Sequence, residues 1–250
     1  FFHQKGTTRQ MSRRRKNTLQ MGHMAAGARA FKTDPLVGQV VQVEAVVTQT
    51  SPGLRGYHLQ AVGSEQDADP ATSEGVFVYV NNSDVGVNVG QRIRLLATVA
   101  EFNGHTQLSN ISASVDCGSS ELPAPTPFGL PVASLAQIEA VEGMLVQFNQ
   151  PLTVNDTFTL GRFGELTLAN GRRYTPTQVV APGAEALALQ ALHALIIIVL
   201  DDASTAQNPA HTRFKWKNMA WLDKIIWLGL RIYQSFYGHR TVVGRNARGA

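Results

Sequence analysis

The chain has 250 residues, with 22 basic and 18 acidic side chains and one cysteine, Cys117. A single cysteine excludes a scaffold held together by internal disulfides. No apolar run reaches the roughly 18 residues that a membrane-spanning helix needs. Residues 31–210 hold seven basic and seventeen acidic side chains, so the net charge of +4 comes from the two ends. Since the body is acidic, the basic total gives no support for duplex binding by phosphate neutralisation.

The two basic ends differ from the body in composition. We expect residues 1–33 to be a disordered basic segment, in which Arg13–Lys16 is either a phosphate-binding arm or a run outside the body's reading frame. Residues 210–250 form a basic tail of doubtful origin that holds all three tryptophans. Its segment 215–237 could be an interfacial helix, a helix docked on the body, or a spurious end. Such ends suggest a fragment or a shifted reading frame, and an ordinary basic tail is the alternative.

Residues 34–118 predict a small β-barrel. Six short segments alternate apolar and polar residues or are rich in β-branched ones, which predicts strands. These segments are Val40–Thr48, Tyr57–Val62, Val76–Val80, Arg92–Glu101, Thr106–Leu108 and Ile111–Val115. Asn103-Gly104 carries the signature of a tight hairpin turn. Short strands separated by turns at regular spacing indicate a closed barrel, and an OB-like barrel fits this pattern best.

A second β unit is expected after a proline-rich connector. Residues 119–140 contain several prolines, which predict an extended linker that ends in a short helical stretch, Ala133–Ala140. Residues 141–209 predict an incomplete unit with a short helix. Its expected elements are strands at Val141–Phe148, Glu165–Ala169 and Ile196–Leu200 and a helix at Ala184–Ala194. The Gly-x-x-Val-Gln pattern at Gly38 and again at Gly143 suggests that the two units are related.

Nucleic-acid binding would need exposed rings for base stacking and cations for phosphate. On an OB-like barrel the second and third strands supply that platform. The candidate residues are the rings of Tyr57, Phe77 and Tyr79 and the guanidinium groups of Arg55, Arg92 and Arg94. Alternation places Phe77 and Tyr79 on the face opposite the neighbouring valines. Either the valines fill the core and the rings are available, or the rings fill the core and the hypothesis loses its support.

Oxygen ligands at short spacing occur in the loop before the third strand. Asp67, Asp69 and Glu74 could form a calcium site, although the EF-hand ligand order is missing and the sequence favours a solvated acidic turn. Asp201-Asp202 could gather a metal or cap the end of a strand. The seven histidines form no zinc motif, and His105, next to the predicted hairpin turn, is expected to face solvent.

A set of short segments carries a resemblance to a known family. In order, they are Pro35–Val47, Asp67–Tyr79, Glu101–Leu108, Leu122–Pro127, Glu142–Val146, Pro151–Val154, Gly161–Leu166, Pro176–Gln178, Ala181–Gly183, Leu200–Asp202 and Gln207–Pro209. Their order and spacing resemble the N-terminal, non-catalytic part of bacterial secreted nucleases of the endonuclease/exonuclease/phosphatase superfamily. The match covers roughly residues 34–209 and stops after Pro209.

The resemblance implies a secreted accessory module without catalytic activity of its own. The partner would be a C-terminal nuclease domain, and the divalent cation, magnesium or calcium, would belong to that domain. Single-stranded or duplex DNA would be the ligand of the module. The alternative is a structural or calcium-stabilised β module that positions a catalytic domain and binds no nucleic acid. No catalytic residue can be assigned in this chain.

Overall fold

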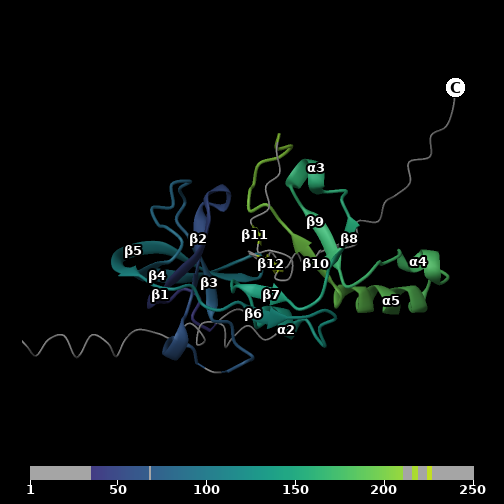
Figure 1. The fold of residues 1–250 in the computed structure, drawn as a ribbon, viewed down its shortest axis with the longest axis horizontal. Helices are drawn as coiled ribbons and strands as arrows, with labels where there is room; N and C mark the ends of the chain where they lie inside the picture. Colours follow the sequence, from purple (N-terminus) through teal and green to yellow (C-terminus); the bar gives the residue numbers. More distant parts are fainter. Residues whose placement is uncertain (1–34, 68, 211–215, 219–223, 227–250) are drawn as a thin grey trace, which may run out of the picture.

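The protein is mainly β. A computed structural model describes residues 35–67, 69–210, 216–218 and 224–226. Five strands form a mixed sheet that closes on itself, here called the ring, at the purple-to-teal end of Figure 1. They are β1 (Val40–Ser51), β2 (Gly56–Gln60), β3 (Gly75–Tyr79), β4 (Gln91–Phe102) and β5 (His105–Ser119). Short 3-10 helices, η2 (Pro52–Leu54) and η3 (Gly63–Glu65), follow β1 and β2.

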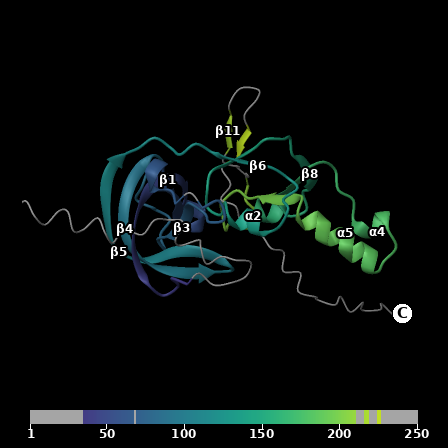
Figure 2. The ribbon, with the colours of Figure 1, turned by 90° about the horizontal axis from the view of Figure 1, so that it is seen from below.

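The ring closes because β1 pairs with two partners. Its first half, Val40–Val46, lies antiparallel to β4, and its second half, Val46–Ser51, lies antiparallel to β2. A register shift between Val47 and Gln49 interrupts the pairing with β2, and such a bulge bends a strand. The order is β1-β2-β3-β5-β4, with β3 parallel to β5 and every other pair antiparallel. Figure 2 shows β4 and β5 side by side along one flank.

The predicted strands of the ring are confirmed with one change. The segments expected at 106–108 and 111–115 form the single 15-residue strand β5. Asn110 has a positive φ of 49°, so a local distortion replaces the expected break. The predicted hairpin turn is present, since Asn103 and Gly104 have φ of 53° and 81°, as a type I′ turn requires.

The interior of the ring is filled by apolar side chains, all aliphatic except Tyr57, that alternate with outward-facing residues. The buried set is Val41, Val43, Ala45, Val47, Tyr57, Leu59, Ala61, Val76, Val78, Ile93, Leu95, Ala97, Val99 and Leu108. Burying apolar side chains of this size is the main stabilising contribution to such a fold.

A second unit, residues 126–204, has a core of its own and lies beside the ring (Figure 1). Its strands are β6 (Thr126–Phe128), β7 (Val146–Phe148), β8 (Thr153–Asp156), β9 (Leu166–Ala169) and β10 (Ile197–Leu200). Its helices are α2 (Ala136–Glu139), α3 (Leu160–Phe163), α4 (Pro176–Val179) and α5 (Ala184–Ala194). The strands form one sheet ordered β10-β9-β8 and a second sheet that contains β7 and β6.

The second unit matches the prediction in its longest helix and in two of its three predicted strands. Helix α5 has the predicted bounds, and β9 and β10 lie within the predicted spans. The strand expected over residues 141–148 is reduced to β7, because residues 141–144 form a turn. Gly38 and Gly143 both have positive φ, 83° and 70°, shortly before β1 and β7. The repeated sequence pattern therefore marks a shared turn, followed by strands of 12 and 3 residues.

The proline-rich segment takes part in the second core. Strand β6 lies parallel to β7, and Phe128, Leu130 and Val132 are buried. The Phe128 ring meets the Phe148 ring edge-on, with centroids 5.6 Å apart. The stretch predicted as an extended connector thus contributes side chains to the unit that follows it.

The basic ends fall largely outside the described residues. This applies to segment 1–33, with Arg13–Lys16, and to most of the tail. Two pieces of the span that could be an interfacial helix are strands, β11 (Trp216–Asn218) and β12 (Lys224–Ile226), and β12 pairs antiparallel with β7. Within the described part of the chain, no helix has the length and apolar character needed to cross a membrane.

Candidate functional site

The outer face of β2 and β3 is where the sequence predicts nucleic-acid binding. Val76 and Val78 point into the core of the ring, so alternation puts Phe77 and Tyr79 on the outer face. The first of the two arrangements left open by the sequence is therefore present. Both rings are half-buried rather than fully exposed. The Phe77 ring packs against His58 of β2, with centroids 5.0 Å apart.

One end of this face is covered by the turn that precedes β7. The Gln60 side chain, fully buried on β2, accepts a hydrogen bond from the Leu145 N–H at 2.9 Å. The Ser73 hydroxyl donates to the Glu142 carbonyl. The backbone of Gly75 lies so close to the turn that a Cβ there would be 2.7 Å from Met144 N. All five residues of β2 are buried, including the polar ones. The second unit therefore covers the Gln60–Gly75 end of the expected binding platform.

A small polar cluster remains open at the end of β3. Asn81 Oδ1 accepts hydrogen bonds from the Tyr79 hydroxyl at 2.9 Å and from Arg55 Nη1 at 3.3 Å. Arg55 follows η2 with a left-handed backbone, φ 56°, and its carbonyl accepts the Val80 N–H. Arg55 and Asn81 are exposed. This places one cation and one ring of the predicted set together, in a patch that we call the Arg55 patch (Arg55, Tyr79, Asn81).

Tyr57 is a correction to the prediction. Its ring is 2% exposed and belongs to the core of the ring. Burial raises the pKa of its phenol to about 12. Tyr57 therefore offers no face to a base. The strand β2 is buried on both faces, so its alternation alone could not tell which residues face the interior.

Arg92 and Arg94 are a second correction, because they lie away from the rings. Both project from β4, whose neighbours are β1 and β5 rather than β2 and β3. Arg92 Nε donates to Glu44 Oε1 at 2.8 Å, and its Nη2 pairs with Glu65. Arg94 Nε donates to Glu44 Oε2 at 2.6 Å. Burial alone would raise the pKa of Glu44, but the hydrogen bonds from the two arginines outweigh it and lower that pKa. These cations are neutralised within the ring.

The carboxylates of the acidic loop before β3 accept hydrogen bonds from the loop itself. Asp67 Oδ1 accepts the Asp69 N–H at 2.8 Å and the Thr72 hydroxyl at 3.1 Å. Glu74 Oε1 accepts the Asp67 N–H at 2.8 Å, and burial raises the pKa of Glu74. Among the described residues, no three His, Cys, Asp or Glu side chains gather where they could hold a metal ion. The geometry favours a turn over the predicted calcium site at Asp67, Asp69 and Glu74.

The carboxylates of Asp201 and Asp202 behave in the same way. Their Oδ1 atoms accept the N–H groups of Ala203 at 2.6 Å and Ser204 at 3.0 Å. This is the strand-end turn that was one of the two interpretations of the sequence.

A titratable cluster joins the ring to α2, and the sequence did not predict it. His105 Nδ1 lies 2.8 Å from Glu142 Oε1, and both side chains are largely covered. The expectation that His105 faces solvent is therefore wrong. Burial, and then the neighbouring Glu142 carboxylate, raise the pKa of Glu139 to about 7. These residues are far apart in the chain, so only the docking of the second unit brings them together.

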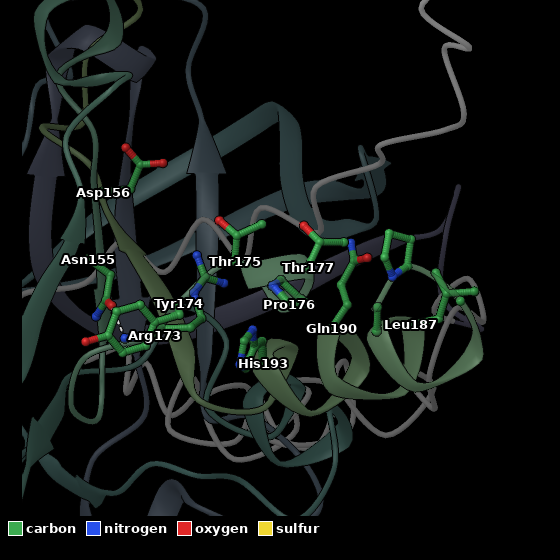
Figure 3. A pocket seen from close by; sticks show the side chains of 13 residues that line it. Asn155, Asp156, Arg173, Tyr174, Thr175, Pro176, Thr177, Leu187, Gln190 and His193 are labelled. Carbon is green, nitrogen blue, oxygen red and sulfur yellow. Dashed lines mark hydrogen bonds between the residues drawn. The ribbon is translucent and has the colours of Figure 1, made fainter. Parts of the chain in front are cut away.

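A cavity of about 600 Å³ lies in the second unit, away from the ring (Figure 3). The loop 173–175, the start of α4 and helix α5 form its walls, and Asn155 and Asp156 of β8 lie at one end. Arg173, Tyr174 and His193 are among its lining residues. No sequence motif singled out these residues, because they come from a loop and a helix whose proximity is set by the tertiary fold.

Comparison with known proteins adds no identification: no protein-family model and no curated protein matches this chain.

Proposed function

We propose that residues 35–210 are the accessory, non-catalytic module of a secreted nuclease, and that the module is structural, positioning a catalytic domain. The order and spacing of the short sequence segments that resemble secreted nucleases support the assignment to that family. The strand order β1-β2-β3-β5-β4 supports an OB-like barrel, a five-stranded architecture that binds its ligands at strands 2 and 3. In this proposal the divalent cation and the catalytic residues belong to the partner domain.

One observation carries the structural role: the β2–β3 face is engaged within the chain itself. Gln60, Ser73 and Gly75 on that face contact the backbone of residues 142–145. At the other end of β2, the Thr205 hydroxyl donates to the Gly53 carbonyl at 3.2 Å. A face used to hold a second unit has less surface for bases. It suits a module that fixes the direction in which the chain leaves the ring. The acidic balance of residues 31–210 supports the same conclusion.

Nucleic-acid binding is the second candidate function, and the Arg55 patch favours it. A guanidinium and a half-buried tyrosine ring at the end of β3, with Phe77 two residues away on the same face, are the groups that single-stranded DNA requires. The patch is small, so the affinity that it supports is modest. Calcium forms no part of either proposal, because the described carboxylates do not gather into a ligand set.

Titration of labelled single-stranded DNA, read by fluorescence anisotropy, separates the two functions. The measurement compares the full chain with Tyr79→Ala and with Phe158→Ala, which removes a ring that is 90% exposed and lies outside the patch. The structural proposal predicts that both variants bind within about two-fold of the parent, because any affinity comes from the basic ends. A selective loss of about five-fold or more in Tyr79→Ala, the scale of one lost stacking contact, would establish the second candidate instead.

A further inference from the structure

The cavity in the second unit presents one arginine, Arg173, within an acidic body. Arg173 from the loop and His193 from α5 both line it, and burial together with the Arg173 charge lowers the pKa of His193. Arg172 lies over the Tyr174 ring, 5.0 Å from its centroid. The only carboxylate among the described lining residues is Asp156, and its Oδ1 accepts the Phe158 N–H at 2.7 Å.

Arg173 of the cavity and its neighbour Arg172, outside the lining, differ from the arginines of the ring. Arg92 and Arg94 are held by carboxylates, whereas Arg172 and Arg173 form no ion pair with any carboxylate in the described part of the chain. An arginine without a carboxylate partner, inside a concavity, has charge to offer to a ligand.

The backbone around Arg173 is fixed before any ligand arrives. The Arg173 N–H donates to Asn155 Oδ1 at 2.6 Å, and Asn155 Nδ2 donates to the carbonyls of Thr153 at 3.0 Å and Gly171 at 2.9 Å. Thr175 and Gln178 then form a capping box at the start of α4. Bonds on both sides of the loop hold Arg173 at the cavity, which reduces the entropy lost when a ligand binds.

We propose that this cavity binds the phosphate group of a nucleotide. A guanidinium is the group best suited to grip phosphate oxygens, and the volume of about 600 Å³ lies within the range of small-ligand pockets. Tyr174, which is 52% exposed, offers an aromatic surface beside the phosphate position. Figure 3 shows Arg173, Tyr174 and His193 along one side of the cavity and Gln190 and Leu187 farther along α5. This assigns a ligand to the second unit and does not depend on the proposed structural role.

The test is calorimetric titration of the full chain with AMP, adenosine and inorganic phosphate. AMP is expected to bind at least about ten-fold more tightly than adenosine, because only AMP carries the phosphate. Inorganic phosphate is expected to compete with AMP. A 5′-phosphorylated oligonucleotide, compared with its unphosphorylated form, shows whether the phosphate can also come from the end of a strand.

Two variants with the same change in charge assign the binding to this cavity. Arg173→Gln is expected to weaken AMP binding by about ten-fold or more. Arg162→Gln is expected to leave it within about two-fold, because Arg162 lies on α3 over the Phe163 ring, outside the cavity. His193→Gln replaces a lining imidazole that comes from a different element, α5, and is expected to weaken AMP binding as well. Melting temperatures of all variants establish that they are folded.

Three results would overturn the proposal. Equal affinity for AMP and adenosine would remove the phosphate from recognition, and this comparison needs no variant. If Arg173→Gln and Arg162→Gln bind AMP with equal affinity, AMP binds outside the cavity, at the basic ends of the chain. If millimolar AMP gives no binding heat and phosphate shows no competition with it, the cavity binds no nucleotide. A Kd of 1 mM corresponds to a binding free energy of about 4 kcal/mol in magnitude.

Discussion

Replacing Gly75 by alanine should separate the second unit from the ring. The added Cβ would lie 2.5 Å from the Gly143 carbonyl oxygen and 2.7 Å from Met144 N. Both are backbone atoms, so no side chain can rotate away to make room. Gly75 has an ordinary strand φ, and the substitution therefore adds no backbone strain of its own. The whole effect must come from contact across the boundary between the two units.

The size of the effect follows from two terms. Forcing a methyl group into a packed contact costs about 1–3 kcal/mol. If the turn moves away, the buried Gln60 Oε1 loses the Leu145 N–H, which costs a further 1–3 kcal/mol or so. A total of about 2–6 kcal/mol is expected, which for a chain of this size lowers the Tm by roughly 4–24 °C.

Thermal unfolding followed by circular dichroism measures this loss, with Gly161→Ala as the control. Gly161 lies in α3, and a Cβ there would meet nothing within 4 Å. The control should match or slightly exceed the stability of the parent, since alanine is the better helix former. If Gly75→Ala unfolds within about 1 °C of the control, the two units do not pack as described.

Three further predictions follow from the same boundary and its neighbouring loop. Because the pKa of Glu139 is raised to about 7 by burial and then by Glu142, ionisation favours the unfolded chain. Urea unfolding should therefore show stability falling between about pH 4.5 and 7, by about 1–2 kcal/mol after allowance for solvent screening. Glu139→Gln should remove this dependence of stability on pH. If the variant loses stability with pH as steeply as the parent, Glu139 is not the group responsible. Gln60→Leu should cost about 1–3 kcal/mol in the same assay by leaving the Leu145 N–H without its acceptor, and a change below about 0.5 kcal/mol would show that the bond is not made. Millimolar calcium should change the Tm by less than about 1 °C, because the Asp67 carboxylate already accepts hydrogen bonds from a backbone N–H and a hydroxyl. A rise of several degrees would show that the loop does bind calcium.

The ring could be predicted from the sequence because its signals are local. Alternation in Val76–Val80 and the Asn103-Gly104 turn fix strands and register over a few residues. The outward direction of Arg92 and Arg94 also follows from alternation. Their pairing with Glu44 depends on the register between β1 and β4, which no local pattern specifies.

The covered face could not be predicted, because it depends on contacts between distant residues. Gln60 meets Leu145 across 85 positions, and Ser73 meets Glu142 across 69. A glycine at the start of a strand, such as Gly75, is a known sign of close backbone approach, but it does not say what approaches. The cavity at Arg173 depends in the same way on how the loop and α5 pack.

Hydrogen exchange at Leu145 tests the central claim most directly. Its N–H donates to the fully buried Gln60 side chain, so it should exchange as slowly as amides in the core of the ring, such as that of Val78. NMR of the full chain can follow both amides in one sample. Protection of Leu145 close to that of Val78 would show that the second unit is held on the β2–β3 face. Exchange of Leu145 at the rate of an exposed loop amide would contradict the account and leave that face open to a ligand.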